Sequence, residues 1–136
     1  AGGWVRPVDA IVGSGFGPRG EQFHAGVDLS AARHSLIRAA SAGTVVTADC
    51  NSSSGTCDAD GGTRTIGCGW YVEIAHAGGV ATRYCHMVRR PEVAAGDTVA
   101  AGQPIGLVGS SGNSSGPHLH YEVHQKACGT GLATAA

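Results

Sequence analysis

Short runs in which apolar and polar residues alternate recur along the chain, and most are bounded by glycine, asparagine, serine or proline. Alternation with a period of two places successive side chains on opposite faces of a strand, so these runs predict half-buried β-strands. The predicted strands are residues 8–12, 24–29, 36–39, 43–48, 70–75, 81–86, 98–100, 104–108 and 118–124. One short helix, of one or two turns, is expected at residues 88–95, broken by Pro91 and ended by Gly96.

The composition agrees with an all-β fold. The chain has 23 glycines, and charged residues make up only 14% of it. Many valines and threonines accompany them, and this mixture favours short strands joined by tight turns. A length of 136 residues suits one hydrophobic core. We therefore expect a single small domain of antiparallel β-sheets with a groove over residues 1–136, with its core at about 8–124, short tails at both ends and a monomeric state.

The charge balance narrows the range of partners. The formal net charge is −1 and the isoelectric point is about 6.7. Without a basic surface, neither nucleic acid nor an anionic membrane is an expected partner. No run of about 18 apolar residues occurs, so no transmembrane segment is expected. The chain also opens without the basic and apolar segments of a signal peptide, so any export signal is expected to have been removed or to lie outside it.

Five cysteines suggest an oxidising compartment. They lie at positions 50, 57, 68, 85 and 128 and form no Cys-x-x-Cys pair, which the common structural zinc modules would contain. Disulfides are the better interpretation, with four cysteines oxidised and one left over. A pair among the first three is expected to close the polar insert of residues 50–68. Cys85 should face away from the groove because it neighbours His86 in a strand, which argues against a cysteine protease.

Two segments far apart in the chain carry metal-binding residue types at strand spacing. His118 and His120 share one face of a predicted strand, as do His24 and Asp28 of another. Imidazole and carboxylate groups suit Zn²⁺, and a site with three protein ligands leaves a fourth position for water. A water bound there becomes a usable nucleophile, because its pKa falls from about 15.7 towards roughly 7. Four residues thus compete for three ligand positions, and spacing alone does not choose among them.

Several motifs together resemble one family. They are Ser-Gly-Phe-Gly-Pro-Arg at 14–19, Phe-His-Ala-Gly-Val-Asp-Leu at 23–29, Tyr-Cys-His at 84–86, and the run from Gly109 to Val123 that contains His-Leu-His. Between about Gly13 and His124 the chain resembles the lysostaphin-type (LytM-like) zinc endopeptidases of bacterial cell walls. The resemblance implies that His24, Asp28 and His120 bind zinc, and that His86 and His118 are catalytic. It also implies a duplicated hybrid β architecture.

The same resemblance implies a function and a location. The substrate would be peptide bonds in the stem or cross-bridge peptides of peptidoglycan, attacked by zinc-bound water. Because no His-Glu-x-x-His motif is present, the roles of general acid, general base and oxyanion stabiliser fall to His86 and His118. The protein would be secreted or held in the cell envelope. The alternative is a non-catalytic or latent relative that binds the cell wall and regulates other hydrolases.

A second resemblance points to another class. Gly-Asp-Thr-Val at 96–99 and Gly-Gln-Pro-Ile at 102–105 are similar to segments of biotinyl and lipoyl carrier domains. A carrier needs a modifiable lysine at an exposed hairpin. The only lysine, Lys126, lies beyond the last predicted strand, which argues against a carrier. The likeness is therefore interpreted as shared β architecture.

Five further expectations concern the surroundings of the site. His76 is expected in a turn, and His124 at an exposed strand end. Tyr84, two residues before His86, is expected on the groove side, either donating a hydrogen bond or packing against the wall. The glycines at 13, 15, 17 and 20 match no phosphate-binding loop, and Gly15 and Gly17 are expected to shape a loop that borders the groove. Residues 109–116 are expected to form a flexible polar loop that delivers His118.

Overall fold

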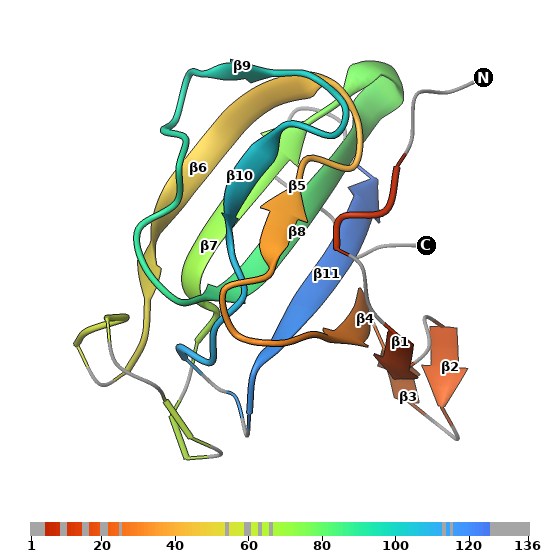
Figure 1. Ribbon diagram of the computed structural model, residues 1–136. Helices are drawn as coiled ribbons and strands as arrows, with labels where there is room; N and C mark the ends of the chain where they lie inside the picture. Colours follow the sequence, from red (N-terminus) through yellow and green to blue (C-terminus); the bar gives the residue numbers. More distant parts are fainter. Residues whose placement is uncertain are drawn as a thin grey trace.

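The protein folds into antiparallel strands (Figure 1). The computed structural model describes residues 5–8, 11–14, 17–19, 22–24, 26–53, 55–58, 61–62, 64–65, 67–112, 114 and 116–125, with the backbone alone for the described residues among 11–27 and for 30 and 125. The strands are β1 Ile11–Ser14, β2 Gly17–Arg19, β3 Gln22–His24, β4 Gly26–Ser30, β5 Leu36–Arg38, β6 Gly43–Asn51, β7 Gly69–Ala75, β8 Val80–Met87, β9 Thr98–Val99, β10 Pro104–Leu107 and β11 His118–Gln125. A 3-10 turn, η1, spans Ala77–Gly79. The prediction of an all-β antiparallel fold is confirmed.

One large sheet contains most of the strands. Its seven strands run in the order β1-β4-β11-β8-β7-β6-β9, and two further two-stranded sheets are β5–β10 and β2–β3. The small β5–β10 sheet lies across the face of the large sheet that Figure 1 shows in front. Strand β11, the last of the described strands, lies between β4 and β8. This position brings residues 26–30 beside residues 118–122, which lie far apart in the sequence.

The hydrophobic core fills the space between the large sheet and the β5–β10 sheet. Ile37 of β5 and Ile105 of β10 are buried, and they belong to the same cluster as buried side chains of β6, β7, β8 and β11. The members from the large sheet include Val45, Val72, Ile74, Tyr84 and Leu119. Because side chains alternate along a strand, the residues between these point to the other face. That second face carries the polar groups described below, and we call it the site face.

The segment predicted as a helix has no helical structure. Residues 88–95 form bends and a turn instead. Their backbone amides bond to β10 rather than to the preceding turn of a helix, with Val88 N donating to Leu107 O at 3.0 Å and Glu92 N donating to Ile105 O at 2.8 Å. Pro91 further disfavours helix in the residue before it. The segment therefore runs along β10.

Two other boundaries differ from prediction. The first strand begins at Ile11 rather than at residue 8, and the predicted strand at 24–29 is divided between β3 and β4. His24 pairs with Gly17 in the β2–β3 sheet, whereas Asp28 lies in the large sheet. Among the described residues, no helix is long and apolar enough to cross a bilayer.

Candidate active site

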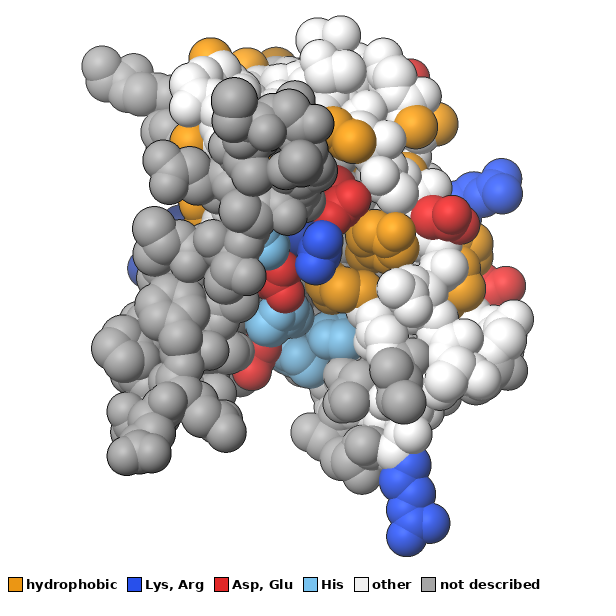
Figure 2. All heavy atoms as spheres, turned by 180° about the vertical axis from the view of Figure 1, so that it is seen from behind, with side chains coloured by type: hydrophobic (Ala, Val, Ile, Leu, Met, Phe, Trp, Pro, Cys, Tyr) orange, Lys and Arg blue, Asp and Glu red, His pale blue; other side chains and the backbone are white. Residues whose placement is uncertain are grey.

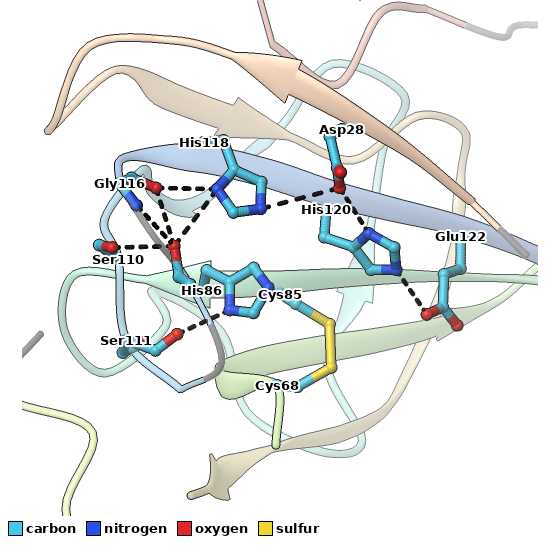
Figure 3. A network of polar contacts seen from close by, with 11 residues as sticks. Asp28, Cys68, Cys85, His86, Ser110, Ser111, Gly116, His118, His120 and Glu122 are labelled. Carbon is cyan, nitrogen blue, oxygen red and sulfur yellow. Dashed lines mark hydrogen bonds and ion pairs between the residues drawn. A yellow bond between two sulfur atoms is a disulfide. The ribbon is translucent and has the colours of Figure 1, made fainter. Parts of the chain in front are cut away.

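Strands β4 and β11 place an aspartate opposite a histidine. Asp28 and His120 are register partners, so their side chains leave the same face of the sheet. His120 Nδ1 lies 2.8 Å from Asp28 Oδ1, and His118 Nε2 lies 3.7 Å from the same oxygen. Figure 3 shows the carboxylate between the two rings. The structure thus brings together three of the residues selected from the sequence.

His86 joins them from β8. Its ring centroid is 4.8 Å from that of His118 and 6.1 Å from that of His120 (Figure 3). Strict alternation would turn this side chain towards the core, because the preceding residue, Cys85, is the register partner of His120 on the site face. His86 instead has a φ of 67°. This left-handed backbone conformation, unusual for a residue other than glycine, interrupts the alternation and turns the ring to the site.

Backbone carbonyls fix the tautomers of both expected catalytic histidines. His86 Nδ1 lies 2.6 Å from Ser111 O, and His118 Nδ1 lies 2.8 Å from Gly116 O. A carbonyl oxygen can only accept, so each Nδ1 carries the hydrogen that it donates. In the neutral ring the other nitrogen, Nε2, is then an acceptor. Both rings therefore have the lone pair of Nε2 available for a proton.

The loop that supplies these carbonyls is packed rather than flexible. Ser110, Ser111 and Ser114 are buried, and Ser111 Oγ donates to Met87 O at 2.6 Å. Gly112 has a φ of 73°, and a Cβ added there would lie 2.3 Å from the backbone nitrogen of Gly69. Only glycine permits so close an approach of the loop to the start of β7. The expectation of a flexible loop is wrong for its described residues, because the serine hydroxyls are satisfied internally.

The ionisation of the site is uneven. Burial lowers the pKa of His86 to about 4, although the bond to Ser111 acts against it. Burial also acts to lower the pKa of His120, but hydrogen bonds to Asp28 and Glu122 outweigh it and raise that pKa to about 9. The pKa of Glu122 falls to about 2, because bonds from His120 and His124 overcome its desolvation. At neutral pH the metal-free site thus holds a neutral His86 beside a charged His120 between two carboxylates.

Two of the three expected zinc ligands lie at the centre of the site. Asp28 and His120 offer a carboxylate oxygen and an imidazole nitrogen that lie 2.8 Å apart, and Zn²⁺ accepts both kinds of ligand. His120 Nε2 is bonded to Glu122 Oε2 at 2.8 Å, the carboxylate arrangement common behind metal-bound histidines. His24 lies in β3, but its side chain is outside the described residues. Within the part of the chain that the structure describes, no three His, Cys, Asp or Glu side chains are arranged to hold a metal.

Three neighbouring residues depart from their sequence-based expectations. Tyr84 is fully buried on the core face, where its hydroxyl accepts a hydrogen bond from Ala40 N at 2.9 Å, so its expected place in the groove is wrong. Cys85 lies on the site face, not away from it. His124 is buried, with 7% of its surface exposed, and its Nε2 lies 2.5 Å from Glu122 Oε1, so it is not an exposed strand end. The interruption at His86 explains the first two departures.

His76 lies immediately before η1, as a turn residue should. Its side chain is nevertheless buried, with Nδ1 2.8 Å from Ala42 O and Nε2 2.8 Å from Thr82 Oγ1. The prediction of its position is therefore confirmed, but the ring is part of the interior.

Two disulfides connect the four cysteines that the structure describes. Cys50 pairs with Cys57, so the predicted closure within the polar insert is confirmed. Cys68 pairs with Cys85, the residue before His86 (Figure 3). The backbone amide of His86 donates to Cys68 O at 2.7 Å. Cys128 lies outside the described residues. A cysteine nucleophile at position 85 is excluded, because its sulfur is in a disulfide.

Several histidine side chains gather on one face of the molecule. Figure 2 shows them in pale blue next to acidic side chains in red, in a hollow of the surface on the side opposite to that facing the reader in Figure 1. Asp28 has 36% of its side chain exposed, against 19% for His118 and for His120. The cluster is thus partly shielded but reachable from solvent.

Comparisons with known proteins converge on one family. Residues 22–130 match Peptidase family M23, which is more than half of the chain. The chain is 36% identical over 102 residues to the DD-carboxypeptidase/endopeptidase Mpg of Neisseria meningitidis, covering 75% of this chain and 20% of that protein. It is 48% identical over 54 residues to the peptidoglycan DD-endopeptidase ShyC of Vibrio cholerae, covering 40% and 12%. The chain therefore spans about a fifth or less of the length of these relatives.

Solved structures agree. The catalytic domain of the prophage-encoded M23 protein EnpA from Enterococcus faecalis superposes with a TM-score of 0.72 at 32% identity, covering 93% of this chain and 88% of that one. The catalytic domain of lysostaphin from Staphylococcus simulans gives 0.68 at 27% identity, covering 93% and 89%. A zinc-containing peptidase from Vibrio cholerae gives 0.71 at 25% identity, covering 98% and 37%. The resemblance drawn from the motifs is thereby confirmed, and the chain belongs to Peptidase family M23, as a peptidase of the lysostaphin type.

Proposed function

We propose that this chain is a zinc-dependent endopeptidase that cleaves peptide bonds in the stem or cross-bridge peptides of peptidoglycan. The observation that carries the proposal is the meeting of Asp28, His86, His118 and His120 from three strands of one sheet (Figure 3). Zinc would be held by His24, Asp28 and His120. Such a set leaves one position open to water or substrate, as in other catalytic zinc sites.

The two remaining histidines perform the proton transfers. When bound, zinc would polarise the scissile carbonyl and acidify a water molecule. His86 stays neutral at physiological pH because burial lowers its pKa, and its Nε2 is ready to accept a proton. His118 presents the same atom beside Asp28, since Gly116 O holds its Nδ1. Between them the two rings take the proton of the attacking water and deliver one to the leaving amine, or stabilise the oxyanion.

The substrate class and the location rest on the relatives. Two of them are named for peptidoglycan DD-endopeptidase or DD-carboxypeptidase/endopeptidase activity. Peptidoglycan lies outside the cytoplasmic membrane, and the two disulfides are consistent with an oxidising compartment. We therefore place the protein in the cell envelope or outside the cell.

The test combines metal analysis with hydrolysis of purified cell walls. The expected result is about one zinc per chain, a falling turbidity of the wall suspension, and loss of both on chelation with recovery on addition of zinc. Release of new amino termini from the wall identifies peptide-bond cleavage. Lysis that persists after zinc has been removed contradicts the proposal, and a chain that binds walls without zinc or cleavage indicates a regulator instead.

A further inference from the structure

A row of three charged side chains crosses three adjacent strands on the site face. Arg83 of β8 is the register partner of both Glu73 in β7 and Glu122 in β11. Its Nε donates to Glu73 Oε2 at 2.7 Å, and its NH1 donates to Glu122 Oε1 at 3.2 Å. Opposite charges directly across neighbouring strands attract. Arg83 is thus held from one side by Glu73 and binds Glu122 on the other.

The two carboxylate oxygens of Glu122 have different partners. Oε2 accepts from His120 Nε2 at 2.8 Å, whereas Oε1 accepts from Arg83 and from His124 Nε2, the latter at 2.5 Å. Only 12% of the Glu122 side chain is exposed. Both oxygens are therefore engaged on the side of His120 that is remote from Asp28. This arrangement does not suit a general base, but it suits a group that fixes the ring of His120.

The orientation of His120 decides which of its nitrogens can bind metal. A hydrogen on Nε2, donated to Glu122, leaves Nδ1 as the nitrogen that faces Asp28. In many metal sites a carboxylate behind the ligand histidine selects the tautomer in this way and makes the ring a better ligand. An isolated ion pair on an exposed surface would contribute little. The pair of Arg83 and Glu122 is instead partly buried, and Glu122 bonds to His120, an expected ligand.

We propose that Glu122 and Arg83 are positioning residues for zinc: Arg83, held by Glu73, orients Glu122, which in turn orients His120 so that Nδ1 faces the metal. This inference rests on the proposed zinc site. It adds two residues that neither the motifs nor the relatives' names assign. Neither residue needs to touch the substrate, so each acts through His120.

The test measures zinc affinity directly, by competition with a chelator, in the whole chain. Glu122→Gln keeps the size of the side chain but removes its charge, and we expect the dissociation constant for zinc to rise by about 10–100-fold. Arg83→Met should raise it less, and Glu73→Gln less again, because each stands one step further from the metal. The visible absorption of the cobalt-substituted protein should also change in Glu122→Gln, since it reports the ligand field.

Glu92→Gln is the matched control. Glu92 is exposed and pairs only weakly with Arg89, at 3.5 Å, far from the expected ligands in the chain. Zinc affinities of Glu122→Gln and Arg83→Met equal to that of Glu92→Gln would overturn the inference while leaving the zinc site in place. If the unsubstituted chain binds no zinc, the proposed function fails with it. Should Glu122→Gln not fold, the graded order of the Arg83, Glu73 and Glu92 variants decides the matter.

Discussion

The two faces of strand β8 carry two polar networks of different kinds. On the core face the hydroxyls of Thr82 and Tyr84 lie 2.8 Å apart, Thr82 reaches His76, and Tyr84 accepts from the Ala40 amide. On the site face Arg83 links two carboxylates, and one of these bonds His120. The first network ends on backbone groups in the interior. The second ends on expected ligands at a surface that solvent reaches.

The difference indicates what each network does. Buried hydroxyls and amides that satisfy one another remove a desolvation penalty and so stabilise the fold. Charged groups held at a partly exposed surface contribute less to stability, but they set the orientation and ionisation of their neighbours. Side chains at neighbouring positions of β8 therefore have different roles: those on the core face stabilise the fold, and those on the site face orient the site residues. Substitutions on the two faces should separate zinc binding and catalysis from stability.

The largest effect is expected at His120. His120→Ala should remove zinc and hydrolysis together, because a site with three protein ligands cannot lose an imidazole and keep the metal. The measurement is zinc content per chain with wall lysis. If His120→Ala keeps its zinc, the assignment of His120 as a ligand from the family motif is wrong.

His118→Ala and His86→Ala should separate catalysis from metal binding. Each is expected to retain zinc while activity falls by roughly 10²–10⁴-fold, the usual cost of a lost general acid or base. Zinc content and the initial rate of wall lysis are measured on the same samples. If His118→Ala loses zinc and His120→Ala does not, the two roles are reversed.

A smaller loss of activity, together with a loss of stability, is expected at Gly112. Gly112→Ala places a Cβ at a φ of 73° and 2.3 Å from the Gly69 nitrogen, so the loop must move and carry Ser111 O away from His86. We expect a loss of about 1–3 kcal/mol in the free energy of unfolding from the strained backbone, and a drop of about 10–100-fold in activity from the misplaced ring. Denaturant unfolding and lysis rates measure the two.

Gly55→Ala is the control for that substitution. Gly55 has a similar φ of 84° but nothing within 4 Å of an added Cβ. It should lose stability through backbone strain alone and keep full activity. Equal activity losses in the two variants would show that the loop contact does not position His86.

The smallest effect on function is expected on the core face. Tyr84→Phe leaves the buried Ala40 amide without the hydroxyl that it bonds, at a cost of about 1–3 kcal/mol in the free energy of unfolding. Zinc affinity and activity should not change. A loss of zinc in this variant would break the separation between the two faces.

The same variant has a signature at high pH. Burial raises the pKa of Tyr84 to about 12, against which the bonds from Thr82 and Ala40 act. A folded-state pKa above the unfolded value of about 10 means that this contribution to stability is complete below pH 10 and is lost as the pH rises towards 12. The stability advantage of the unsubstituted protein over Tyr84→Phe should therefore shrink across that range. Urea unfolding at a series of pH values measures it.

Alternation in the sequence predicted most of the sheet and the pairing of its polar residues. Spacing placed His118 and His120 on one face of their strand, and the structure makes His120 the register partner of Asp28. The alternation rule failed where the backbone leaves the extended conformation. The φ of 67° at His86 places both Cys85 and His86 at the site, and residue types alone do not signal such a break.

Contacts between distant loops were also beyond sequence reasoning. The serines of residues 110–114 look like a flexible linker by composition, yet the described ones are buried because Gly69 and Gly112 allow the two segments to touch. Glu122 and His124 follow His120 at intervals of two residues, so they lie on the same face of β11. Arg83 links them to Glu73. It lies in another strand, β8, so only the order of strands in the sheet reveals this contact.

The bond between Asp28 and His120 joins residues 92 positions apart in the chain. Contacts so distant form late, because closing a long loop costs entropy before the contact repays it, and chains rich in such contacts fold slowly. Synthesis proceeds from the amino terminus, so β11 is the last of the described strands to emerge. A nascent or truncated chain that ends before β11 lacks His118 and His120 and cannot assemble the site. The proposed hydrolysis of cell walls therefore requires that β11 has been added to the sheet.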